Sequence, residues 1–422
     1  MTRLQLGAGG ALCLAAGLTL APAAFAQSAG AVPPTAVKPP ATDFAGRLGL
    51  PGRILLDTRL RYEAVAQEGL EDANALTFAG RLGYEITPIR RLSFLVEMEG
   101  VAQLTTDFAD TVEVRPGLPV VADPETLQRN RFQVRYQGPL GLEATLGRQR
   151  IIWDDARFIG NVGFRQNEQT FDALYFDWKP IKALDVRYGY LDRVDRIFGN
   201  DSPVGVFRSD SHVAQVDWRP EPLGAVAAYA LALDFANSPR NSHLTYGLRW
   251  SRPLPLGDWR GKLALEGARQ SDYRGNTPEF TVHYAKTSAS IGRGPIDVAF
   301  TGEWLEGDGA RGFETPLATL HAFQGFADVF LVTPPEGLRD LNLSATWKVA
   351  KPPIGQAFSL LARGHQFTND TGSAEFGREF DALARLKMNK WLTLELRSAV
   401  FSGRDPRFPD KTRVWLAAET SF

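Results

Sequence analysis

Arginine and carboxylate side chains recur at alternate positions along many short segments of this 422-residue chain. Arg59 and Arg61, for example, flank Leu60. A guanidinium group holds a carboxylate through parallel N–H donors, so a row of arginines facing a pore would form successive binding positions for an anionic ligand. Eight arginines are predicted to form this row: Arg59, Arg61, Arg81, Arg131, Arg135, Arg363, Arg385 and Arg397.

Acidic residues occupy the same faces as these arginines. They include Glu63, Glu97, Glu99, Asp381 and Glu395. In a functional interpretation, these acids keep ligand binding weak enough for movement through a pore. In the alternative interpretation, the charges pair with one another and only brace the wall.

The sequence gives little support for catalysis. The five histidines are scattered, and no His-x-x-x-His pair, nucleophile elbow, P-loop or dinucleotide fingerprint follows residue 26. Asp154 and Asp155 are adjacent carboxylates, but such loop pairs usually face water or a cation such as Arg157. The formal net charge of −1 gives no reason to expect a nucleic acid partner. We predict no enzymatic activity, cofactor or metal site.

The segments that carry the charges have a period of two residues. Leu56, Leu60 and Tyr62 alternate with Asp57 and Arg61, which is typical of a strand with one apolar and one polar face. About eighteen such segments follow one another over residues 51–422. An even number of amphipathic strands predicts an all-β fold, a closed transmembrane antiparallel β-barrel. Closure would bring the last strands against the first, so that their arginines share one wall.

The connections between these segments alternate in length. Every second one is short and usually contains Pro or Gly, whereas 106–129, 151–168, 195–208 and 306–337 are long. This alternation is typical of the periplasmic turns and extracellular loops of outer-membrane barrels. The last long connection is partly apolar and is expected to fold into or over the mouth.

Both ends of the chain predict export to the outer membrane of a Gram-negative bacterium. Residues 1–26 have the features of a cleaved signal peptide, with an apolar stretch at 12–20 and small residues at Ala24 and Ala26. Residues 27–50 form a Pro-rich leader that is expected to be disordered. The chain stops on Phe422 at the end of an alternating segment, like the signal that the outer-membrane assembly machinery recognises. That machinery and outer-membrane lipid are therefore predicted partners.

Several longer stretches resemble the signature segments of the alginate-export family of outer-membrane proteins. They are 121–125 (VADPE), 147–151 (GRQRI), 158–173 (FIGNVGFRQNEQTFDA) and 315–321 (TPLATLH). The resemblance covers about residues 53–422. It implies an eighteen-stranded barrel whose Arg- and Lys-lined lumen selects a uronate polymer, with periplasmic export partners.

Three further candidate ligand residues lie in these segments: Arg148, Arg150 and Arg165. A bulge at Gly147 would turn Arg148 and Arg150 inward, because strict alternation would aim them at lipid. Arg165 lies within reach of a constriction formed by its loop. Alternatively, these arginines only pin the loop to the wall.

The sequence therefore predicts a passive channel for an anionic polysaccharide or oligosaccharide, with export of an alginate-like polymer as the first hypothesis. One alternative is a general anion-selective uptake porin. Another is a non-conducting barrel whose loops serve adhesion or assembly.

Overall fold

The computed structural model describes residues 49–221, 223–276 and 279–422. The predicted signal peptide and nearly all of the leader lie outside these residues. The described chain contains eighteen strands: β1 (Arg53–Gln67), β2 (Ala73–Ile89), β3 (Leu92–Gln103), β4 (Thr126–Gln137), β5 (Leu142–Gln149), β6 (Thr170–Ile181), β7 (Leu184–Asp195), β8 (Val206–Trp218), β9 (Ala225–Leu233), β10 (His243–Leu256), β11 (Trp259–Asp272), β12 (Thr281–Arg293), β13 (Ile296–Leu305), β14 (Leu338–Val349), β15 (Ala357–Thr368), β16 (Glu375–Lys387), β17 (Leu392–Gly403) and β18 (Lys411–Ser421). Single-turn 3₁₀ helices follow β4, β9 and β13: η2 (Pro139–Gly141), η3 (Pro239–Asn241) and η4 (Leu320–Ala322). Among the described residues, none of the helices has the length and apolar character needed to cross a membrane.

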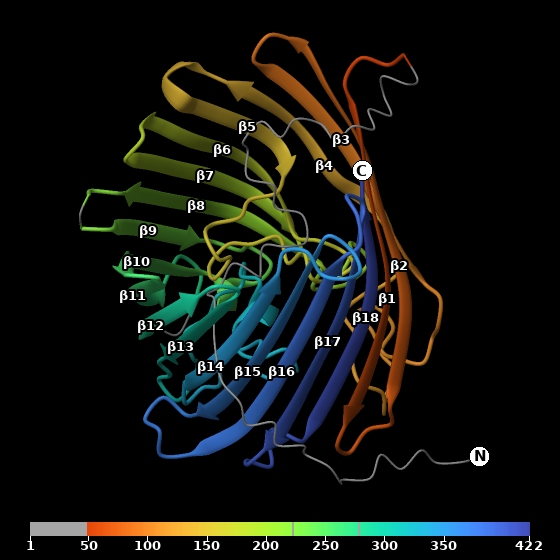
Figure 1. The fold of residues 1–422 in the computed structure, drawn as a ribbon, viewed down its shortest axis with the longest axis vertical. Helices are drawn as coiled ribbons and strands as arrows, with labels where there is room; N and C mark the ends of the chain where they lie inside the picture. The colour runs from red at the N-terminus through yellow and green to blue at the C-terminus, as the bar shows by residue number, and fades with distance from the viewer. Residues whose placement is uncertain (1–48, 222, 277–278) are drawn as a thin grey trace.

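Hydrogen bonding closes the sheet on itself. Every strand pairs antiparallel with its sequence neighbours, and β1 pairs with both β2 and β18. Tyr62 lies opposite Leu76 on one side and Leu416 on the other. The predicted antiparallel barrel of eighteen strands is therefore confirmed. Figure 1 shows the tilted strands running around the barrel and loop segments folded into its interior.

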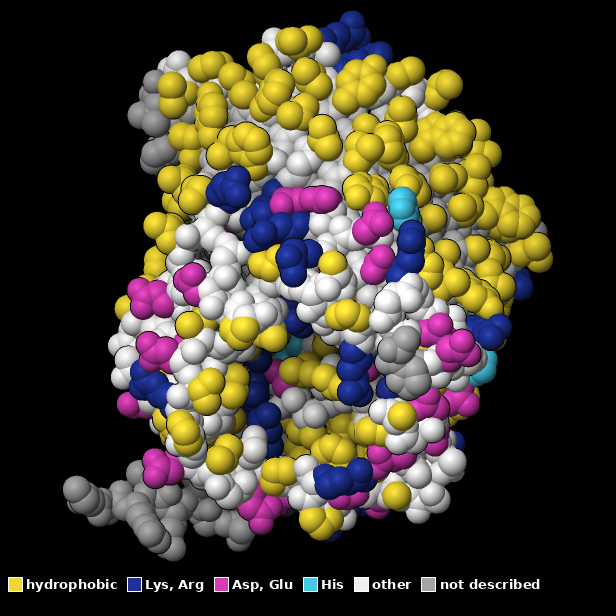
Figure 2. Space-filling view, turned by 180° about the vertical axis from the view of Figure 1, so that it is seen from behind, with side chains coloured by type: hydrophobic (Ala, Val, Ile, Leu, Met, Phe, Trp, Pro, Cys, Tyr) yellow, Lys and Arg dark blue, Asp and Glu magenta, His cyan; other side chains and the backbone are white. Residues whose placement is uncertain are grey.

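Apolar and polar residues that alternate along each strand lie on the outer and inner faces of the barrel, respectively. On β1 the side chain of Leu60 is 43% exposed, whereas Arg59 and Arg61 on either side are 7% and 3% exposed. An outward apolar face is the lipid-facing surface of a barrel, and the inward face is polar. Figure 2 shows hydrophobic side chains gathered over much of the outer surface, and a hollow in which Lys and Arg side chains are visible.

The two ends of the barrel differ in their connections. We call one the short-turn end; its connections are 90–91, 138–141, 182–183, 219–224, 257–258, 294–295, 350–356 and 388–391. At the opposite, long-loop end, the connections 104–125, 150–169 and 306–337 are the longest. Their side chains pack inside the barrel: the ring of Phe158 lies 4.8 Å from that of Tyr229 on β9 and 6.3 Å from that of Phe313. The loop 306–337 thus folds inward, as its apolar residues predicted.

The predicted bulge at Gly147 is wrong. The register of β5 with β4 and with β6 runs through Gly147 without a shift. Gly147 instead has φ of 105°, and a Cβ atom there would lie 2.3 Å from the carbonyl oxygen of Phe132. Only glycine tolerates this conformation and this close approach of the neighbouring strand.

Phe422→Ser is expected to reduce assembly of the barrel. The Phe422 N–H donates to the carbonyl of Leu56 at 2.9 Å across the seam between β18 and β1, and the Phe422 ring stacks on Trp391, next to β17, at 6.0 Å. Ser would keep the backbone bond but lose the ring contact. The outer-membrane fraction and heat-modifiable gel mobility would measure the loss. Phe422→Tyr, which keeps the ring, is the control. Assembly of the serine variant at the wild-type level would show that the ring is dispensable.

Candidate functional site: a charged luminal cavity

The barrel encloses a cavity of about 450 Å³. Its described lining contains eight Lys or Arg and six Asp or Glu. Five of the cations form what we call the arginine wall: Arg59, Arg61, Arg363, Arg385 and Arg397. They come from β1, β15, β16 and β17, which closure places in one continuous part of the sheet. Residues from opposite ends of the chain therefore share one wall, as the barrel hypothesis predicted.

The arginine wall is partly paired with acids on its own strands. Glu395 accepts hydrogen bonds from Arg385 at 2.5 Å and from Arg397 at 2.9 Å. Arg363 lies 3.5 Å from Asp381. Nε of Arg363 and of Arg397 is buried and has no hydrogen-bond partner within the described chain.

Besides lining the cavity, Arg59 and Arg61 form hydrogen bonds that hold the loop 150–169. Arg59 donates to the carbonyls of Gly163 and Arg165, both at 2.9 Å, and Arg61 donates to the carbonyl of Phe164 at 2.5 Å. Arg59 also pairs with Glu419 at 2.8 Å. Most donors of these two side chains are therefore occupied by the protein.

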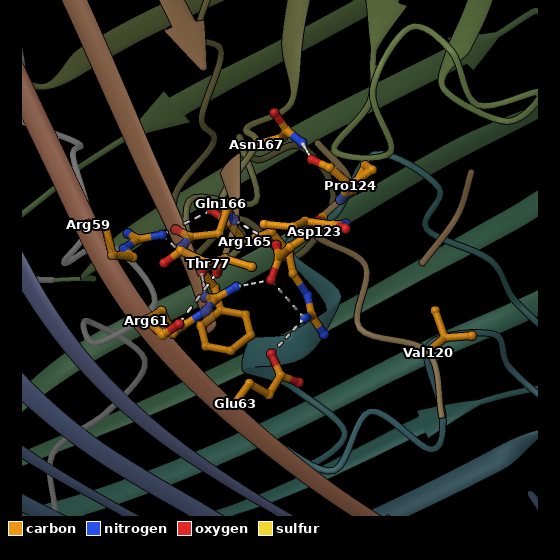
Figure 3. A network of polar contacts seen from close by, with 12 residues as sticks. Arg59, Arg61, Glu63, Thr77, Val120, Asp123, Pro124, Arg165, Gln166 and Asn167 are labelled. Carbon is orange, nitrogen blue, oxygen red and sulfur yellow. Dashed lines mark hydrogen bonds and ion pairs between the residues drawn. The ribbon is translucent and has the colours of Figure 1, made fainter. Parts of the chain in front are cut away.

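Arg165 lies at the centre of a buried network that joins three loops to β1, and Figure 3 shows part of it. It pairs with Glu63 at 3.2 Å and with Asp328 at 2.7 Å. Asp123 accepts a hydrogen bond from Arg61 and another, at 2.8 Å, from the N–H of Gln166. Burial alone would raise the pKa of Asp123, but Arg61 and Arg165 outweigh burial and lower it. The network fixes the loops against the wall.

The remaining predicted arginines also lie outside the lining of the cavity. Arg81 and Arg131 pair with Glu99 and Glu97, both at 2.5 Å, and Arg81 and Arg150 both face Glu168. Arg148 bridges Asp172 and Asp195 at 2.7 and 2.8 Å. Arg135 lies 3.5 Å from Glu143. These contacts agree with the alternative interpretation, in which the charges pair with one another and only brace the wall.

The lining also contains three cations on β10, β11 and β12 that were not predicted from the sequence. Lys286 pairs with Asp155 at 3.0 Å, and Arg249 pairs with Asp154 at 2.8 Å. Lys262 also lines the cavity. Each of the three cations occupies an inward position of an alternating segment. The period of two residues could therefore have predicted that they face the lumen.

A histidine on the inward loop connects three parts of the site. The ring of His321 stacks on Phe164 at 3.6 Å with an interplanar angle of 5°, and on Phe326 at 5.0 Å. Its Nδ1 lies 2.7 Å from Asp328, and its Nε2 lies 2.5 Å from Nη1 of Arg397. We call these contacts the His321 latch. Desolvation lowers the pKa of His321 to about 4, although Asp328 opposes this shift.

Comparisons with known proteins define the class of fold. No known protein family matches the sequence, and neither does any curated protein. A BenF-like porin from Pseudomonas fluorescens Pf-5 aligns with 87% of this chain and 98% of its own, with a TM-score of 0.67 and 13% identity. Pseudomonas aeruginosa OpdK, solved with vanillate, gives a TM-score of 0.66 and 14% identity over 87% and 98% of the two chains. OccK2 (OpdF) from the same species, solved with glucuronate, gives 0.62 and 14% over the same shares. The fold is that of eighteen-stranded outer-membrane porins, and the resemblance to the alginate-export family stays a prediction.

Proposed function

We propose that this chain forms an anion-selective channel in the Gram-negative outer membrane and admits small carboxylates. The observation that carries the proposal is the arginine wall, which lines an inward cavity across adjacent strands. A narrow lumen with low-dielectric walls focuses the field of its charges and raises the local concentration of counter-ions. The guanidinium groups that line the cavity would hold a carboxylate briefly during passage.

The size and filling of the lumen favour a small substrate over a polymer. Ligand sites for small molecules have volumes of roughly 300–1,000 Å³, and the cavity measures about 450 Å³. The loops 150–169 and 306–337 occupy the lumen through buried ion pairs such as Arg165–Asp328 and Arg157–Glu303. An extended polyuronate would have to displace these loops.

The similar structures also support a small substrate over a polymer. Vanillate and glucuronate, with which OpdK and OccK2 were solved, are small carboxylates. The general anion-selective porin, an alternative in the sequence analysis, is therefore supported better than export of an alginate-like polymer. The non-conducting barrel gains no support from a charged cavity of this size.

Bilayer recording of the refolded protein lacking residues 1–26 tests this proposal. We expect a reversal potential that favours chloride in a potassium chloride gradient, and concentration-dependent block by glucuronate or vanillate. Glucose, which is uncharged, is the control for block by size alone. A pore that prefers cations would overturn the proposal, and block by polyuronate without block by monocarboxylates would restore the export hypothesis.

A further inference from the structure

The charges of the connections are unevenly distributed between the two ends of the barrel. The short turns contain six Lys or Arg and two Asp or Glu. The long-loop end is acidic, with Glu68, Glu71 and Asp72 together in the first connection alone. We call the six cations of the short turns the rim cations: Arg90, Arg91, Lys182, Arg219, Lys351 and Lys390. A charge excess at one end of a barrel indicates a partner of opposite charge at that end.

The rim cations are exposed and nearly unpaired. Within the described chain, only Arg219 has an ion pair, with Asp185 at 4.0 Å. An exposed cation without a partner gives the barrel no internal stability. Its donors remain available to a ligand outside the protein.

Neighbouring tryptophans indicate that the rim cations lie at the surface of the membrane. Trp178, Trp218, Trp259, Trp347 and Trp391 lie next to short turns, and each is between 37% and 51% exposed. Tryptophan is enriched at the level of the lipid headgroups, where its apolar ring and its N–H donor are both satisfied. The turns just beyond this belt therefore lie at the level of the lipid phosphates.

One contact joins a rim cation to this belt directly. Nζ of Lys390 lies 5.0 Å from the centre of the Trp391 ring. A cation–π contact favours a position of the cation beside the interfacial ring, close to the headgroups. Basic clusters at this level bind anionic lipids.

We propose that the rim cations, with the adjacent tryptophans, bind the phosphate groups of anionic phospholipids in the leaflet that the short turns face. The cations are spread over five of the eight short turns, so they follow the perimeter of the barrel. Lipids contact the whole perimeter, whereas a folded protein partner would contact one sector. This proposal requires a membrane-inserted barrel but does not depend on what passes through the lumen.

The test compares two variants of equal charge change. The first replaces all six rim cations by Gln. The second replaces six exposed arginines of the long-loop end by Gln: Arg208, Arg269, Arg274, Arg378, Arg404 and Arg407. Refolded proteins are offered equal amounts of phosphatidylglycerol and phosphatidylcholine, and retained lipid is measured by native mass spectrometry. Heat-modifiable mobility confirms folding, and Lys351→Gln/Lys390→Gln replaces the sixfold variant if the latter fails to fold.

We expect the wild type and the long-loop variant to retain phosphatidylglycerol several-fold over phosphatidylcholine, and the rim variant to lose this preference. Equal retention of both lipids by the wild type would overturn the proposal. So would the same loss in both variants, or a rim variant that keeps its preference. Binding of soluble polyuronate at the rim without any lipid preference would also reject a phospholipid partner.

Discussion

Reversing Arg363 and Arg385 together to Glu is expected to shift the selectivity of the pore toward cations by about tenfold, which corresponds to about 1.4 kcal/mol. Both side chains line the cavity, and neither donates to the carbonyls that hold the loop 150–169, although Arg363 donates to the carbonyl of Ala322 on the loop 306–337 at 3.3 Å. The change replaces two positive charges by two negative ones beside Asp381 and Glu395. The reversal potential in a salt gradient measures the shift, and block by glucuronate should disappear with it.

The matched control reverses two outward-facing arginines, Arg269 and Arg378. Both are exposed and lie beside inward-facing Gln270 and Glu379 on their strands. The net charge of the protein then changes equally, but the field in the lumen changes little. If the control shifts selectivity as much as the luminal variant does, the arginine wall does not set selectivity. Arg363→Gln/Arg385→Gln should give an intermediate shift, since it removes charge without reversing it.

Arg59 and Arg61 show how far the sequence predicts such a site. The period of two residues places both on the inward face, and closure of the barrel places them beside the arginines of β15 to β17. Periodicity specifies the face of a strand but not the partner that the side chain meets there. Their partners are carbonyls of residues 163–165, about a hundred positions away in the chain. The arginines that anchor the loops therefore cannot be separated by pattern from those that line the cavity.

The same limit applies to loops that fold inward. Phe313 and Phe326 gave a compositional reason to expect an inward loop, because apolar residues in a long connection need a place to pack. Nothing in the local sequence pairs His321 with Arg397, or Arg157 with Glu303, since these contacts depend on how two loops fold against each other. The strands, their number and their faces follow from local alternation, whereas the shape of the cavity follows from contacts between distant loops.

Acidification is expected to weaken the His321 latch and to raise the conductance of the channel. The hydrogen bonds assign the neutral tautomer: Nδ1–H donates to Asp328, and Nε2 accepts from Arg397. Protonation would add a donor at Nε2 directly opposite the Arg397 donor, and would place two cations together in a buried site.

The sign and size of the effect follow from the pKa of His321. Burial lowers this pKa from 6.5 to about 4, so the latched arrangement binds a proton less readily than the released one. The latch therefore has its full stability above about pH 6.5, loses stability as the pH falls from there toward 4, and changes little below that. One pKa unit corresponds to about 1.4 kcal/mol, so the loss approaches about 3 kcal/mol.

Single-channel recording between pH 7 and pH 4 measures the opening. His321→Gln removes the titration while keeping a donor and an acceptor, so its conductance should stay constant over this range. His212→Gln, which changes an exposed histidine on β8, should respond to pH like the wild type. Equal pH responses of the wild type and His321→Gln would show that another group controls the loop. A wild-type conductance that does not change between pH 7 and pH 4 would show that Asp328, Arg397 and the aromatic stack hold the loop without help from the charge state of His321.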